Sequence, residues 1–343
     1  MTKKIIALVL TLTMGLSLTA CSKSNNTNEQ STNKETVADN TENTTTTEEE
    51  STTTTPENIT VTTKNGNDEE IQIEVPYDPQ RIAVLDLASL DILDNLGLGD
   101  RIVGMSKGTS IDYLQKYNTD ETIANLGTIK EADLEAVMAC EPDVIFIGGR
   151  LSSSYDALSE IAPVITISSD YEVGLIESVK ANSSMIASLF GLENEFNDIF
   201  TTFEERVAAL AAVSKGHTAL VGMVTSSNFN TLGNDSRCSI IGNEIGFENL
   251  AVDVDSTHGN ESSFELVAKL NPEYIFVLDR DAAIGTDGAK LAKEVMDNEL
   301  VQKTTAYENS QIIYLTPAVW YTAEGGLTAT DIMLQDLEAS LLR

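Results

Sequence analysis

The chain has 343 residues, 41% of them hydrophobic, so it is long enough to bury a sizeable core and to form more than one folded unit. Its 54 acidic residues far outnumber its 21 lysines and arginines, and the formal net charge is −33 at pH 7. Such acidity argues strongly against nucleic acid as a partner, because phosphate backbones are repelled. It also makes the seven arginines conspicuous as places where an anion could bind.

The first 20 residues have the pattern of a secretory signal, because Lys3 and Lys4 precede a short apolar stretch that turns polar directly after Cys21. The stretch is too short to span a bilayer. The sequence Leu-Thr-Ala-Cys21 resembles a bacterial lipobox, which implies that the signal is removed and that Cys21 is acylated, for example with palmitate. An ordinary signal peptide that happens to contain a cysteine is the alternative.

Residues 21–58 are predicted to form the lipidated cysteine and a disordered tether. They are almost entirely Ser, Thr, Asn and Glu, and such a segment cannot bury enough apolar surface to offset its conformational entropy. As a flexible coil it would hold the folded part roughly 35 Å from the lipid. We therefore expect a lipid-anchored protein on the extracytoplasmic face of a bacterial cell membrane.

The next segment, residues 59–192, alternates strands and helices and is predicted to be a parallel α/β lobe. An edge hairpin with its turn at Asn65-Gly66 comes first. The expected strands and helices that follow it are a strand at 82–86, a helix at 87–96, a strand at 102–105, a helix at 131–141, a strand at 144–148, a helix at 155–161 and a strand at 164–167.

A long helix is expected over residues 193–215, with apolar residues at helical spacing, and a second α/β lobe over residues 216–343. This second lobe begins with a strand at 219–224 and ends with a helix at 330–342. The predicted fold class is therefore α/β, with two lobes joined by a single long helix. A helical connector resists hinge bending, so we expect only a small closure on ligand binding.

Two stretches exactly 130 residues apart, Glu131–Arg150 and Glu261–Arg280, are identical at seven of twenty aligned positions. Each predicts a helix, a proline that ends it, and a buried strand that ends in an arginine. Ligands bind at the carboxyl ends of strands in open α/β sheets, so we expect Arg150 and Arg280 to present matching cationic groups to one cleft. The alternative is that each arginine pairs with a local carboxylate, and Asp279 or Asp281 would serve Arg280.

Several motifs together resemble one family over about residue 60 to the C-terminus. They include Pro-Gln-Arg-Ile-Ala-Val-Leu-Asp86, Gly-Gly-Arg150, Asn-Asp-Ser-Arg237, Ser-Thr-His258-Gly, Val-Leu-Asp-Arg280 and Val-Trp-Tyr321. The chain resembles the class III substrate-binding proteins of ABC importers for siderophores, haem and cobalamin, and especially the branch that binds ferric catecholate siderophores, including petrobactin. It departs from that pattern at Cys238 and in the Thr-Ala-Glu-Gly-Gly326 segment after Tyr321.

The resemblance implies a monomer that binds a ferric siderophore as ligand, has no permanent cofactor, catalyses no reaction and delivers its cargo to an ABC permease. Haem, cobalamin or another iron chelate is the alternative ligand. Arg150, Arg237 and Arg280 suit a ferric catecholate, because guanidinium groups stay charged, donate several hydrogen bonds and stack on rings. Lys107 is predicted to add positive charge at the rim, with an ordinary solvated lysine as the alternative.

The resemblance also assigns roles to four other residues. His258 and Tyr321 would complete the coordination of iron when a chelator offers fewer than six donors, since phenolate is a hard ligand and imidazole is acceptable. Glu135 and Glu265, at equivalent places in the two repeats, would dock on arginines of the permease. The alternatives are an ordinary histidine, an ordinary tyrosine and two ordinary surface glutamates.

Other classes of function have weaker support. Gly-Met-Ser106-Lys-Gly matches the nucleophile elbow of serine hydrolases, but that motif needs a helix directly after the serine. A zinc or manganese carrier would need more than two histidines, and a purely structural lipoprotein would not need arginines in a cleft. Cys140 and Cys238 are predicted to be buried and unpaired, because they lie in different halves.

Overall fold

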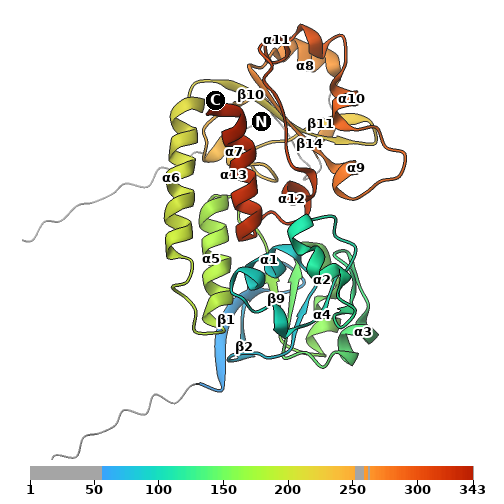
Figure 1. The fold of residues 1–343 in the computed structure, drawn as a ribbon, viewed down its shortest axis with the longest axis vertical. Coiled ribbons are helices and arrows are strands. Elements are labelled where there is room, and N and C mark those ends of the chain that lie inside the picture. The colour runs from blue at the N-terminus through green and yellow to red at the C-terminus, as the bar shows by residue number, and fades with distance from the viewer. Residues whose placement is uncertain (1–55, 252–258, 262, 343) are drawn as a thin grey trace, which may run out of the picture. The chain divides into compact units, whose positions relative to one another are not determined.

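The computed structural model describes residues 56–251, 259–261 and 263–342 (Figure 1). All of these residues belong to one unit of the chain, Thr54–Arg343. The predicted signal, Cys21 and nearly all of the predicted tether therefore lie outside the described residues, and so does His258. Within the described ranges, no helix combines the length and the apolar character needed to cross a bilayer.

The first sheet has five parallel strands in the order β5-β4-β3-β8-β9. Strand β3 is buried throughout and β8 over its first four residues, as expected for a parallel sheet covered on both faces. The predicted strands at 102–105, 144–148 and 164–167 are confirmed. The bounds are β3 (Ile82–Val84), β4 (Ile102–Met105), β5 (Ala124–Asn125), β8 (Val144–Gly148) and β9 (Val164–Ile167).

Short elements surround this sheet. The antiparallel hairpin of β1 and β2 confirms the predicted edge hairpin and packs on β9, where the backbone N–H of Thr166 donates to the Thr63 hydroxyl at 2.8 Å. The bounds are β1 (Asn58–Lys64), β2 (Glu70–Pro76), β6 (Gly127–Thr128), β7 (Glu131–Ala132), α1 (Leu87–Asn95), α2 (Gln115–Thr119), α3 (Leu134–Ala139) and α4 (Tyr155–Ser159).

Two helices follow the first sheet, α5 (Leu175–Ser188) and α6 (Asn197–Ser214) (Figure 1). Helix α6 is somewhat shorter than the predicted helix at 193–215, because the chain makes turns between Gly191 and its first residue. It buries Phe200, Phe203 and Leu210 on one face and packs against both α5 and α13 (Leu327–Leu341). The division of the chain into two lobes at these residues remains a prediction.

The second sheet has the strand order β13-β11-β10-β14-β15, and β12 also pairs with β10. Strands β12, β10, β14 and β15 are parallel, whereas β11 and β13 add an antiparallel edge. The strands are β10 (Thr218–Thr225), β11 (Asn228–Thr231), β12 (Glu248–Asn249), β13 (Asn260–Glu261), β14 (Tyr274–Asp279) and β15 (Ile312–Tyr314).

The helices of this half are short except for the last. They are α7 (Ile240–Asn243), α8 (Phe264–Leu270), α9 (Arg280–Ala283), α10 (Ala292–Met296), α11 (Thr305–Glu308) and α12 (Pro317–Thr322), followed by α13. Both repeat units have the predicted order, since α3 ends before Pro142 and leads into β8, and α8 ends before Pro272 and leads into β14.

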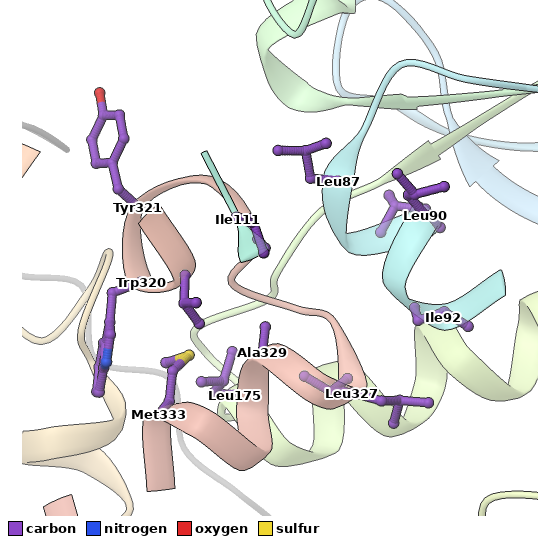
Figure 2. Packing of buried hydrophobic residues seen from close by; sticks show 14 of the residues in the cluster. Leu87, Leu90, Ile92, Ile111, Leu175, Trp320, Tyr321, Leu327, Ala329 and Met333 are labelled. Atoms are coloured by element: carbon purple, nitrogen blue, oxygen red, sulfur yellow. The ribbon is translucent and has the colours of Figure 1, made fainter. Parts of the chain in front are cut away.

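One hydrophobic cluster contains residues from both halves of the chain. Figure 2 shows Leu90 and Ile92 of α1, Leu175 of α5, and Leu327 and Met333 of α13 in this cluster. Two smaller clusters contain residues of β8 and β14 that are absent from the large one. The segment α12–α13 is therefore tied to the first half of the chain by packing, and this segment carries Tyr321.

Candidate functional site

Tyr321 lies near the end of α12, next to the buried Trp320. The helix begins at Pro317, whose fixed φ suits the first helical position. Trp320 is fully buried, and its indole N–H donates to the carboxylate of Asp336 at 2.8 Å. Tyr321 is only 2% exposed, and Figure 2 shows its ring pointing away from the ring of Trp320. The buried tryptophan therefore fixes the direction in which the tyrosine points.

Three arginines surround Tyr321. Arg150 and Arg237 each donate a hydrogen bond of 3.0 Å to its backbone carbonyl oxygen, and Arg280 Nε donates to its hydroxyl at 3.0 Å. The guanidinium carbons lie 5.4, 4.5 and 5.7 Å from the ring centroid for Arg150, Arg237 and Arg280, within the range of cation–π contacts. The three arginines predicted to share a site therefore meet on one residue.

The local fold explains how two of these arginines reach the site. Arg150 follows β8 and Arg280 follows β14, so each leaves the carboxyl end of a parallel strand as the repeat predicts. Arg237 comes from the loop between β11 and α7. Arg280 also pairs with Asp281 at 3.3 Å, so the alternative of a local carboxylate partner holds for this arginine alongside its contact with the tyrosine.

The arginines change the acidity of Tyr321. Burial by itself raises the pKa of this phenol, but the hydrogen bond from Arg280 and the charges of Arg280, Arg237 and Arg150 outweigh it, so the pKa of Tyr321 is lowered. A phenol in this setting gives up its proton more readily than one in water. It is therefore better suited to contact a metal ion or an anionic oxygen network.

A cavity of about 400 Å³ opens beside this cluster. Its lining contains cationic, acidic and aromatic side chains together with backbone from the end of β8 and the segment after β9. The residues are Asp86, Gly148, Gly149, Arg150, Ile167, Ser168, Ser169, Tyr171, Arg237, Tyr321, Thr322 and Glu324. Arg280 is not part of this lining and reaches the cavity through Tyr321.

Two carboxylates in the lining were not anticipated from the sequence. Asp86 caps α1, where its side chain accepts from the backbone and hydroxyl of Ser89, and burial nevertheless raises its pKa. Glu324 has both carboxylate oxygens buried, and burial raises its pKa to about 7. The sequence indicates neither role clearly. Asp86 is the last residue of the Pro-Gln-Arg-Ile-Ala-Val-Leu-Asp86 motif, and Glu324 lies in the segment that departs from the family pattern.

Both departures from the family pattern involve the carboxylate of Glu324. One is Cys238, and the other is the segment that contains Glu324 itself. Cys238 is 2% exposed and has a positive φ of 66°, which few residues other than glycine adopt. The charge of Glu324 helps to raise the pKa of its thiol, which is therefore unreactive. Cys140 is buried as well, and neither cysteine forms a disulfide, as predicted.

Lys107 is not brought to the arginines. Its ammonium group donates to the carbonyl oxygen of Asp120 at 2.6 Å, and the side chain lines a separate cavity of about 340 Å³. Ser106 lines the same cavity, is 2% exposed, and is followed by a loop rather than a helix until Asp112. The strand–serine–helix geometry of a nucleophile elbow is therefore missing at Ser106.

Glu135 and Glu265 occupy matching positions in the first turns of α3 and α8. Both are exposed, and neither forms a hydrogen bond or an ion pair with a residue that the structure describes. Large apolar side chains are exposed on the same two helices, namely Leu134, Met138 and Leu266. Across the described part of the chain, no group of three or more His, Cys, Asp or Glu side chains is arranged to hold a metal ion.

The carboxyl end of β8 and the arginines gathered on Tyr321 meet at a charged cavity, which is the geometry of a ligand-binding site. The chain belongs to the periplasmic binding protein family, whose sequence model matches residues 82–319. The fold is the class III fold of that family, as the resemblance implies.

Several relatives are named for binding a siderophore or a ferric complex. The petrobactin-binding protein YclQ of Bacillus subtilis is 33% identical over 284 residues, which are 82% of this chain and 88% of that protein. The ferric-anguibactin-binding protein FatB of Vibrio anguillarum is 25% identical over 273 residues, 78% and 84% of the two chains. Among solved structures, the catecholate-siderophore-binding protein VctP of Vibrio cholerae is 31% identical with a TM-score of 0.75, covering 82% of this chain and all of its own.

Proposed function

We propose that this protein captures a ferric siderophore of the catecholate type, as its charge pattern favours, and delivers it to an ABC importer for iron uptake. The observation that carries the proposal is the meeting of three arginines on Tyr321 beside a cavity of about 400 Å³, in a chain whose net charge is −33. An anionic iron complex needs such local compensation in an acidic protein. The ligands named for the relatives support this function.

The arginines bind the complex in this proposal. Each guanidinium has N–H groups that Tyr321 does not use, and these donate hydrogen bonds to catecholate oxygens. The planar guanidinium also stacks on a catechol ring. Tyr321 and His258 occupy open coordination positions of the iron when the chelator has fewer than six donors, and the lowered pKa of Tyr321 favours this role. No bond of the siderophore is made or broken, and the protein acts as a carrier.

The anchor and the partner complete the proposal. Cys21 carries the lipid and residues 21–58 form the tether, so a monomer remains on the extracytoplasmic face of the membrane. Glu135 and Glu265 contact the permease, which requires them to be exposed on separate helices, as they are. Lys107 adds positive charge at the rim in this proposal, because the cavity that it lines shares Thr322 with the cavity beside Tyr321.

Fluorescence quenching tests the ligand class. The chain has a single tryptophan, Trp320, which directly precedes Tyr321. Titration with ferric catecholates, ferric hydroxamates, haem and cobalamin should give the tightest binding for a ferric catecholate. Replacing Arg237 with Gln should weaken that binding about tenfold or more, because a donor and a charge are lost.

The matched control is Lys303→Gln, which removes one positive charge at an exposed position outside the lining of the cavity and should change nothing. Tightest binding of haem or cobalamin would instead support the alternative ligands. For a tetradentate chelate, Tyr321→Phe should also alter the absorption spectrum of the bound iron complex. An unchanged spectrum and affinity would remove Tyr321 from the coordination shell.

A further inference from the structure

The cavity beside Tyr321 contains as many carboxylates as arginines. Arg150 and Arg237 line it, and so do Asp86 and Glu324, so its lining is neutral when both carboxylates are ionised. A site that only needed to attract an anion would not contain these acidic groups. Asp86 has a structural task, because it caps α1 through Ser89. Glu324 has no comparable task.

Glu324 is held in the cavity without a satisfied partner. Both of its carboxylate oxygens are buried and lack a hydrogen bond. The Tyr171 hydroxyl and the backbone N–H of Cys238 lower the pKa of Glu324 and so favour its ionised form, but neither reaches hydrogen-bonding geometry. Arg237 is the nearest strong influence of opposite charge, and its own Nε is buried without a hydrogen bond. A buried charge pair without donors to complete it is costly.

We propose that Glu324 sets the net charge of the iron complex that the cavity accepts, by cancelling part of the charge that Arg237 offers to the ligand. The inference rests on the proposed function and adds a charge class to it. With Glu324 ionised, the cavity favours a monoanionic complex, such as iron(III) held by two catecholates. A trianionic complex of three catecholates is accepted well only when Glu324 is protonated.

Two other members of the lining also have shifted pKa values: burial raises the pKa of Asp86, and the charges of the arginines lower that of Tyr321. Arg237, Tyr171, Cys238 and Arg150 influence the pKa of Glu324, and Tyr321 and Asp86 line the same cavity. The arginines stay charged, and burial raises the pKa of the Tyr171 hydroxyl and of the Cys238 thiol. Burial raises the pKa of Glu324 to about 7. Affinity for a trianion should therefore rise as the pH falls.

The test compares wild type with Glu324→Gln, which keeps the shape and removes the charge. The probes are a hexadentate tris-catechol amide and a tetradentate bis-catechol amide, each loaded with iron(III). Near pH 8 the variant should bind the trianionic complex about tenfold more tightly than wild type and the monoanionic complex no more than about threefold more tightly. Near pH 6 the two proteins should bind alike, because Glu324 is then neutral in wild type.

The chelators also titrate with pH, but they do so equally for both proteins. The ratio of the two affinities at each pH therefore reports on the protein alone. Calorimetry in buffers of different ionisation enthalpy should also show proton uptake when wild type binds the trianion near pH 7, and none in the variant. Glu324→Ala should repeat the change in charge preference if the glutamine were to perturb the fold. Glu308→Gln, an equal loss of charge at the exposed end of α11, should have no effect.

The outcomes separate this inference from the function on which it rests. If wild type binds neither iron complex, the proposed function fails. If wild type binds but the variants leave the charge preference and the proton uptake unchanged, Glu324 does not select charge and the function stands. Equal weakening of both complexes would assign Glu324 a role in positioning the ligand instead and would overturn the inference.

Discussion

Tyr321 contacts each of its three arginines in two ways. Its carbonyl oxygen accepts from Arg150 and Arg237, its hydroxyl accepts from Arg280, and its ring lies within cation–π distance of all three. Like charges held this close would repel one another without a shared acceptor. The tyrosine therefore makes the arginine cluster possible, and the charge of Glu324 offsets part of the charge of Arg237.

The buried carboxyl of Glu324 predicts a dependence of stability on pH. Its pKa is about 7 in the folded protein and 4.5 in the unfolded chain, so the folded state holds the proton more tightly. Stability from this group is present below about pH 4.5 and is lost as the pH rises toward 7. Between pH 4.5 and pH 8, wild type should lose up to roughly 3 kcal/mol of stability relative to Glu324→Gln.

Urea unfolding of the two proteins at several pH values measures this difference directly. The free energies of unfolding should be similar near pH 4.5 and should diverge as the solution becomes more alkaline, with the variant the more stable. A constant difference across the range would contradict the raised pKa. The same measurement on Glu308→Gln provides the baseline for an exposed glutamate.

Some site residues could be predicted from the sequence and others could not. Arg150 and Arg280 follow apolar strand runs in a repeat, so their positions at strand ends are a local property. Arg237 was found only through the resemblance, because a loop gives no geometric signal. Glu324 was missed because a carboxylate becomes buried through contacts between distant segments, and the place of Lys107 at the rim stays a prediction.

At the scale of elements, α1 holds the start of α13. Asp91 of α1 is fully buried, and its two carboxylate oxygens accept from the backbone N–H groups of Thr328 and Ala329, each at 2.9 Å. The residue before α13 is Gly326, which has no side chain to cap the helix. A Cβ there would lie 2.3 Å from Asp91 Oδ2, so glycine is required by the close approach. A carboxylate from a distant helix thus serves as the N-terminal cap.

Replacing Asp91 with Asn should destabilise the protein by about 2–3 kcal/mol, because one acceptor oxygen and its charge at the helix start are lost. Urea unfolding at pH 7 measures the loss in the free energy of unfolding, and the dependence of that free energy on urea concentration should be the same for both proteins. The control is Asp94→Asn on the same helix, whose carboxylate contacts Tyr117 and Lys116 nearer the surface and should cost under about 1 kcal/mol. Equal losses for both variants would argue against the capping role.

The borrowed cap also explains an error in the predicted elements. The sequence predicts the last helix from residue 330, whereas α13 begins at Leu327, because the cap comes from Asp91 rather than from a neighbouring residue. The strands were predictable because buried parallel strands are continuous apolar runs. The two-residue strands, such as β12 and β13, were not, since their pairing depends on tertiary position and not on a pattern.

At the scale of the whole molecule, the repeat gives each half of the chain an exposed glutamate on a helix and an arginine after the next strand. The helices α3 and α8 carry Glu135 and Glu265, and the arginines follow β8 and β14. Exposed apolar side chains accompany both glutamates. Surfaces that combine charge with apolar area are typical of protein–protein contacts.

Reversing both charges, with Glu135→Lys and Glu265→Lys together, should abolish siderophore-dependent iron uptake by cells while ligand affinity stays within about twofold of wild type. The reason is that arginines on the permease would then meet lysines. Uptake of a radiolabelled ferric catecholate and a fluorescence titration of the purified protein measure the two quantities. Glu160→Lys with Glu308→Lys reverses the same number of exposed charges and should leave uptake intact. Loss of ligand binding in the docking variant would refute the role.

The shared tyrosine also limits how this binding site can change during evolution. A substitution of any one arginine alters the ring and carbonyl contacts that the other two use, so the effects of single changes will not add up in combination. Drift toward a new ligand is therefore expected to proceed through residues that touch only part of the cluster. Position 324, which adjoins Arg237 and Arg150 without contacting the whole group, is such a residue.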